Sequence, residues 1–125
     1  MKEDKFSLMK RIKSFVYALN GLKILIKEEH NARIHLFLAF LAIFLAIFLK
    51  IDKYEWIAVI FAIGLVFITE IANSAIENMA NFVCKEQNDN IKKIKDLSAA
   101  MVLVAAITAL LVGMIVFLPK MLTLL

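Results

Sequence analysis

Residues Leu97 to Leu118 form a run of 22 amino acids without a charged side chain. An α-helix of this length is about 33 Å long, which is enough to cross the hydrocarbon core of a bilayer. The run therefore predicts a transmembrane helix. The overall composition agrees, because 62% of the 125 residues are hydrophobic and the mean hydropathy is +0.83, which is too apolar for an ordinary soluble domain.

Two further segments are apolar enough to cross a membrane. Leu36 to Leu49 is unbroken apolar sequence, and its apolar flanks bring it to about the lower length limit for a span. Trp56 to Cys84 favours one helix of about 43 Å, whose end should protrude beyond the hydrocarbon core. We expect residues 1–125 to form one unit with spans at about 34–51, 55–84 and 91–118, the last ended by Pro119 and Lys120.

The N-terminal segment has a different pattern. Its apolar residues recur at steps of three and four, while most of its basic residues lie off that stripe, a pattern typical of a helix in the headgroup layer. The apolar positions include Ile12, Phe15, Val16 and Leu19. The sequence thus predicts an all-α membrane protein, with an amphipathic surface helix at about 9–30 and three transmembrane helices.

The basic residues predict an orientation. Eight Lys and Arg lie in the first 33 residues, two in 50–55, four in 85–96 and one in the tail. The positive-inside rule then places the N-terminus and the second connector in the cytoplasm. The net charge of +4 is attributed to this topology and to anionic lipid, and no nucleic-acid motif is present.

Polar residues interrupt the long second span on one side only. At 3.6 residues per turn, one stripe carries Glu70, Asn73, Ser74, Glu77 and Asn81. An ionised residue at the centre of a membrane helix costs roughly 2.5–3.5 kcal/mol, so two acids on one stripe must face a wet or protein-lined space. The alternative is that these polar residues only hold neighbouring helices together through hydrogen bonds.

The predicted topology brings other charged residues to the same membrane face: Glu28, Glu29, Arg33, Lys93, Lys95 and Asp96. Carboxylates without thiols suit a hard cation such as Mg²⁺, and lysines suit phosphates. No Gly-rich phosphate loop is present, so side chains would have to hold a nucleotide. Cys84 is alone, and His35 is interpreted as an interfacial residue rather than a metal ligand.

Two blocks carry a family resemblance. Glu70-Ile-Ala-Asn-Ser-Ala-Ile-Glu77 is followed by Lys95-Asp-Leu-Ser98-Ala-Ala, and Tyr17, Gly21, Glu29 and Arg33 precede them at matching spacing. This pattern resembles the small prokaryotic diacylglycerol kinases and their undecaprenol kinase relatives. The resemblance implies a homotrimer in the bacterial inner membrane, with active sites between chains on the cytoplasmic side and MgATP as phosphate donor.

The resemblance also implies a role for each matching residue. Glu70 would be the general base that takes the proton of the lipid alcohol, and Glu29 and Glu77 would hold Mg²⁺. The nucleotide would be bound by Tyr17, Glu29, Asn73, Glu77, Asn81, Lys95 and Asp96, and the site would be positioned by Ser74, Ser98 and Arg33. Asn81, Asn88 and Ile94 stand where the family usually has Asp, His and a small residue.

The lipid acceptor is expected to be diacylglycerol, with phosphatidate as the product. Undecaprenol is the alternative, because Asn31 to His35 looks more like the undecaprenol kinase branch. A proton-coupled exporter would favour a single acid near the midplane, and a holin-like structural protein would need no acids on one stripe. The sequence therefore favours a lipid kinase over both of these classes.

Overall fold

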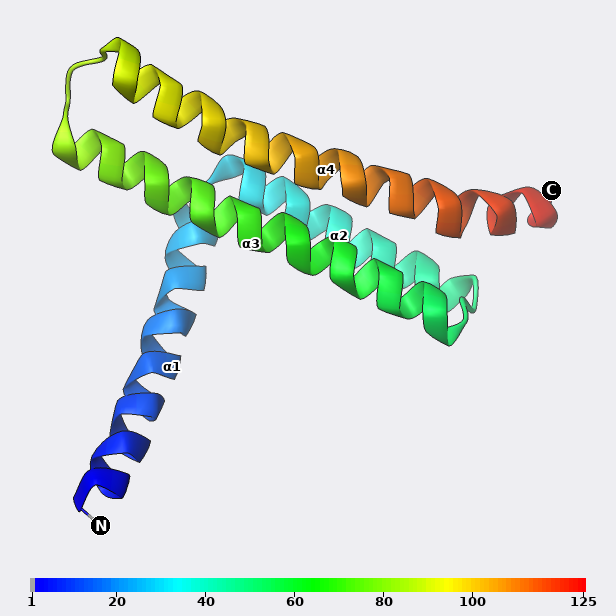
Figure 1. Cartoon of the computed structure of the whole chain (residues 1–125). Helices are drawn as coiled ribbons and strands as arrows, with labels where there is room; N and C mark the ends of the chain where they lie inside the picture. Colours follow the sequence, from blue (N-terminus) through cyan, green and yellow to red (C-terminus); the bar gives the residue numbers. More distant parts are fainter. Residues whose placement is uncertain (1) are drawn as a thin grey trace.

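The computed structural model describes residues 2–125, with side chains from residue 7 onward. Within residues 2–125 the chain forms four α-helices: α1 (Lys2–Glu28), α2 (His30–Phe48), α3 (Lys53–Val83) and α4 (Asp89–Leu124). Helices α2, α3 and α4 lie side by side, and α1 leaves them at a steep angle (Figure 1). The predicted all-α class is confirmed, and the last three helices are each long and apolar enough to cross a membrane.

Helix α1 begins earlier in the chain than the predicted surface helix and ends two residues sooner, at Glu28. Its apolar side chains are exposed, including Ile12, Phe15 and Leu19. In the last turn, by contrast, Leu25 is only 3% exposed and Ile26 is half-buried. Helix α1 is thus tied to the rest of the chain by its final turn, and its apolar surface is left uncovered.

Helix α2 lies against α3 through small residues. Its buried residues are Ala32, Ala39 and Ala46, spaced seven apart. Positions seven apart lie on the same face of a helix, and alanine there lets two membrane helices approach closely. This face also brings the first turns of α2 close to the polar stripe of α3.

The turn between α2 and α3 is fixed by local geometry. Helix α2 ends at Phe48, before the predicted limit of 51. Lys50 then adopts a left-handed backbone conformation, with φ at 51°. Asp52 begins α3 as a capping box: its carboxylate accepts from the Glu55 N–H at 2.9 Å, and its own N–H donates to the Glu55 carboxylate at 3.1 Å.

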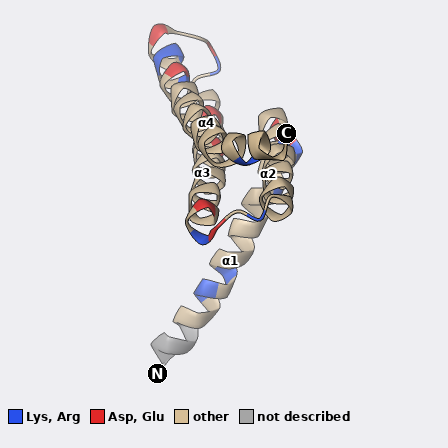
Figure 2. Ribbon diagram, turned by 90° about the vertical axis from the view of Figure 1, so that its right-hand side faces the viewer, with Lys and Arg blue, Asp and Glu red and all other residues tan. Residues whose placement is uncertain are grey.

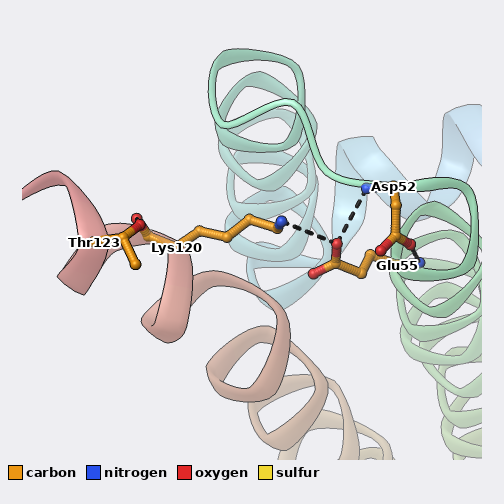
Figure 3. A network of polar contacts seen from close by, with 4 residues as sticks. All are labelled: Asp52, Glu55, Lys120 and Thr123. Carbon is orange, nitrogen blue, oxygen red and sulfur yellow. Dashed lines mark hydrogen bonds and ion pairs between the residues drawn. The ribbon is translucent and has the colours of Figure 1, made fainter.

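The expectation that Pro119 and Lys120 end the last helix is wrong. Helix α4 continues through Pro119 to Leu124. A proline removes its own N–H donor and crowds the preceding turn, but a helix can continue past it when other contacts hold the last turn. Lys120 supplies such a contact, because its Nζ lies 3.2 Å from Glu55 Oε1 at the start of α3 (Figure 3).

Apart from Glu70 and Glu77 of α3, charge lies towards the ends of the helices that could span a membrane. Charged side chains gather at the turn between α2 and α3 and at the loop between α3 and α4, and α1 carries further basic residues (Figure 2). The flanks of α2, α3 and α4 expose large apolar side chains such as Phe44, Phe61 and Ile115. Such a surface suits lipid hydrocarbon or a neighbouring membrane helix rather than water.

Candidate functional site

The polar stripe of α3 runs from a buried end to an exposed end. The side chain of Glu70 is 1% exposed, and Ser74, one turn later, is also buried. Asn73 and Glu77 are half-buried, and Asn81 is exposed. The stripe therefore leads from solvent at Asn81 into the interior at Glu70, as the helical spacing predicts.

Glu29 joins this stripe from another part of the chain. It is the single residue between α1 and α2, and its extended backbone, with φ at −102° and ψ at 113°, caps the start of α2. Its Oε1 accepts a hydrogen bond from Ser74 Oγ at 3.2 Å. Since Ser74 lies between Glu70 and Glu77 on one helical face, the predicted trio of acids is brought together.

His35 contacts the buried acid directly. Its Nε2 lies 3.2 Å from Glu70 Oε1, and its side chain is 20% exposed. Within the described residues, Glu70 Oε1 has no hydrogen bond of good geometry, so this is an ion-pair approach rather than an aligned hydrogen bond. The interpretation of His35 as an interfacial residue missed this contact, which lies between two helices and leaves no signal in local spacing.

Hydrogen bonds connect the stripe to α4. Ser98 Oγ donates to Asn73 Oδ1, and Asn73 Nδ2 in turn donates to Glu77 Oε1 at 3.4 Å. Both hydrogen bonds use the same Asn73 amide, which fixes its orientation. The Glu77 carboxylate is therefore held by a chain of contacts that begins on α4.

Lys95 and Asp96, which are expected to bind the nucleotide, lie near the exposed end of the stripe. Lys95 Nζ donates to Asn81 Oδ1 at 2.7 Å, which joins α4 to α3 near the connecting loop. Asp96 pairs instead with Lys92 at 2.7 Å, and both side chains are about two-thirds exposed. Lys95 thus belongs to the stripe, while Asp96 lies on the open side of α4.

Besides Asp96, two more of the expected site residues are not brought to the stripe. Tyr17 is 70% exposed on α1, and Arg33 is exposed near the start of α2. Within residues 7–125 neither side chain makes a hydrogen bond or an ion pair of its own. A ligand or a second chain would be needed to connect them to Glu70.

The Glu29 and Glu77 carboxylates suit a Mg²⁺ ion that is also bound by phosphate oxygens and water. No group of three His, Cys, Asp or Glu side chains in the described part of the chain could hold a metal ion by itself. Mg²⁺, however, usually takes only one or two protein carboxylates and completes its shell with phosphate oxygens and water. Glu29 and Glu77 each use one oxygen in a hydrogen bond with the stripe, which leaves the other oxygen of each for such an ion.

An apolar groove begins beside His35. It lies between α2, α3 and α4, has a volume of about 570 Å³ and reaches Met121 towards the other end of α4. Apart from His35, its lining is formed by apolar side chains. The buried acid of the stripe is therefore paired with a histidine at the mouth of a space that hydrocarbon could fill.

Fold and site together define a class: a small helical membrane protein with an acidic, metal-compatible site at one end of its bundle. The chain belongs to the family described as prokaryotic diacylglycerol kinase, whose sequence pattern matches residues 16–117. The family places it among the lipid kinases.

The relatives of this chain include both an undecaprenol kinase and diacylglycerol kinases. An undecaprenol kinase from Bacillus subtilis is 28% identical over 120 residues, 96% of this chain and 98% of the relative. A diacylglycerol kinase from Haemophilus influenzae is 36% identical over 94 residues, 75% of this chain and 80% of the relative. A diacylglycerol kinase from Synechocystis is 33% identical over 112 residues, 89% of this chain but 64% of the relative.

Proposed function

We propose that this protein transfers the γ-phosphate of ATP to the hydroxyl group of a membrane lipid, with Mg²⁺ as cofactor. The observation that carries the proposal is Glu70, a carboxylate 1% exposed within a helix that could span a membrane, flanked on one face by the half-buried Glu77 and by Glu29. A buried acid of this kind is expensive and marks a functional site.

In the proposed reaction Glu70 acts as the general base. The lipid oxygen forms a bond to the γ-phosphorus, the bond from that phosphorus to the bridging oxygen of ADP breaks, and the lipid proton passes to the Glu70 carboxylate. Proton transfer to a positioned side chain typically contributes 10²–10⁴-fold. The groove beside His35 would accept the lipid chain, which brings the hydroxyl to the depth of Glu70.

The nucleotide would lie over the exposed half of the stripe. Phosphoryl transfer needs positioning and charge neutralisation more than covalent chemistry. Glu29 and Glu77 would hold Mg²⁺, which neutralises phosphate charge when it is bound. Lys95, held by Asn81 at 2.7 Å, would contact the phosphates. The remaining proposed contacts are Tyr17, Asn73 and Asp96 to the nucleotide, with Ser74, Ser98 and Arg33 positioning the site.

The exposed apolar surfaces support association in the membrane. We infer that α1 lies on the membrane surface and that the chain forms a homotrimer with active sites between neighbours. Tyr17 and Arg33 lack side-chain partners within the described part of one chain, and a second chain could supply them. The distribution of Lys and Arg supports an orientation with the N-terminus and the site on the cytoplasmic side of a bacterial inner membrane.

Diacylglycerol is the proposed lipid acceptor, because two of the relatives above are named diacylglycerol kinases. Undecaprenol is a second candidate, which is favoured by a different observation: the undecaprenol kinase match covers nearly the whole of both chains. Both lipids place one hydroxyl group at the edge of an apolar tail, so both suit a groove that ends at His35.

The deciding experiment measures phosphate transfer from labelled ATP with Mg²⁺, using purified protein in mixed micelles. Diacylglycerol and undecaprenol are supplied in separate reactions. We expect labelling of diacylglycerol to be faster, and faster labelling of undecaprenol would assign the second candidate. No labelling of either lipid by folded protein would contradict the proposed function.

Neighbouring acids provide a matched control for metal binding. Glu29→Gln should raise the Mg²⁺ concentration needed for half-maximal activity at least tenfold, because it removes one of two proposed ligands. Glu28→Gln changes an exposed acid of the same type one residue earlier and should have no such effect. Equal effects of the two variants would remove Glu29 from the metal site.

A further inference from the structure

His35 is the basic side chain at ion-pair distance from Glu70. The distance from Nε2 to Oε1 is 3.2 Å, and no other basic group in the described chain pairs with this acid. Helix α3 has no Lys or Arg after Lys53. Among the described residues, the basic group that pairs with the buried acid thus comes from α2.

The other charges around Glu70 have the same sign as its own. The charged groups that face it are His35 of α2 and the carboxylates of Glu29 and Glu77. On α4 the polar side chain of this network is Ser98, which is uncharged. A buried carboxylate is costly to keep charged unless a group of opposite charge is close, and His35 is at 3.2 Å. A neutral Glu70 could not accept a proton from a lipid alcohol.

From this arrangement we propose that His35 is a positioning residue that keeps Glu70 ionised and ready to act as a base. An imidazolium at this position would supply the charge that the acid needs, and His35 lines the apolar groove in which the lipid chain is proposed to lie. The inference rests on the proposed role of Glu70 in lipid phosphorylation. It assigns to His35 a function beyond the predicted place at the membrane interface.

The test is the pH profile of kcat for His35→Gln with MgATP and diacylglycerol in mixed micelles, and with undecaprenol in parallel. Glutamine keeps a polar side chain but cannot carry the charge. We expect the acid limb of the profile to move to higher pH by at least one unit. Activity at pH 7 should fall about tenfold or more and recover as the pH is raised, while KM for MgATP changes less than twofold.

Three further variants test whether the shift comes from the charge of His35. His35→Lys restores a cation and should return the acid limb towards that of the unchanged protein. His30→Gln alters the other histidine, which is exposed at the start of α2, and should leave the profile unchanged. If His35→Gln does not assemble, His35→Asn carries the same prediction with a shorter side chain.

Loss of activity in His35→Gln with an unchanged acid limb would overturn the inference, and so would full activity at every pH. Glu70→Gln in the same assay separates this result from failure of the proposed function. If Glu70→Gln is inactive and the His35→Gln profile is unshifted, only the role of His35 is wrong. If Glu70→Gln stays active, the base assignment and the inference drawn from it are both wrong.

Discussion

Two polar clusters at different places in the bundle are built in opposite ways. The turn clamp, formed by Asp52, Glu55 and Lys120, is closed, because both acids are used in the capping box and the lysine pairs with Glu55 (Figure 3). The Glu55 N–H holds the pKa of the Asp52 carboxyl below its ordinary value. Each charged group of the turn clamp has a partner within one chain.

The polar seam, formed by Glu29, His35, Glu70, Asn73, Ser74, Glu77 and Ser98, is left open. Glu70 Oε1 is buried without an aligned hydrogen bond, and the seam holds three acids but one histidine, which contacts Glu70. Natural proteins usually satisfy buried polar groups, so an unsatisfied one needs an explanation. The turn clamp is satisfied within one chain, whereas the polar seam leaves a buried carboxylate oxygen without a hydrogen bond, as expected if a ligand binds there.

The largest effect should come from Glu70→Gln. The change keeps the shape of the side chain but removes the base, so turnover should fall by roughly 10³-fold or more while assembly is unchanged. Glu55→Gln, the matched change in the turn clamp, should keep turnover within about twofold. Labelled phosphate transfer measures both. Full activity of Glu70→Gln would show that the open seam is not the reaction centre.

A smaller effect is expected from Ser98→Ala. It removes the donor to Asn73 Oδ1 and releases the amide that orients Glu77. Loss of one hydrogen bond of about 1 kcal/mol corresponds to about fivefold, which should be seen as a higher KM for MgATP. Thr108→Ala is the control, because the Thr108 hydroxyl donates only to the Val104 carbonyl of its own helix.

Asn81→Asp should change activity still less. The new carboxylate would pair with Lys95, but exposed pairs contribute only about 0–1 kcal/mol, so KM for MgATP should stay within about threefold or improve. Asn81→Leu should raise KM further, because it removes the oxygen that holds Lys95. Collapse of activity in folded Asn81→Asp protein would show that position 81 has a different role.

The smallest effect on activity is expected from Lys120→Gln. It breaks the contact with Glu55 while leaving the polar seam intact, so kcat should be unchanged and the melting temperature should fall by about 2–4 °C. A thermal melt in the same micelles measures this shift. A drop in kcat without a change in melting temperature would mean that the two clusters are coupled.

Much of the fold could be predicted because few backbone structures can cross a membrane. Apolar runs and charge placement identify three spans, and helical spacing puts Glu70, Ser74 and Glu77 on one face. The end of α4 could not be predicted from local signals, because Lys120 holds the last turn through a residue 65 positions earlier in the chain. The low helix propensity of proline predicted that α4 ends at Pro119. The contact between Lys120 and Glu55 overrode that preference.

The site was predictable where its residues share a helix and less so where they do not. Glu29 and Ser74 are 45 residues apart, so local spacing could not predict the hydrogen bond between them. His35 was missed for the same reason. Asn88, an unexplained departure from the family pattern, acts as the N-cap of α4, since its Oδ1 accepts from the Ile91 N–H at 2.9 Å.

Glu29 is the one residue that separates α1 from α2, and its carboxylate is bonded to Ser74. The direction in which α1 leaves the bundle and the position of that carboxylate therefore share one pair of backbone dihedrals. Any ligand that prefers one position of Glu29 must, by reciprocity, favour one inclination of α1. The joint thus links the inclination of α1 to the place of the Glu29 carboxylate on the polar face of α3.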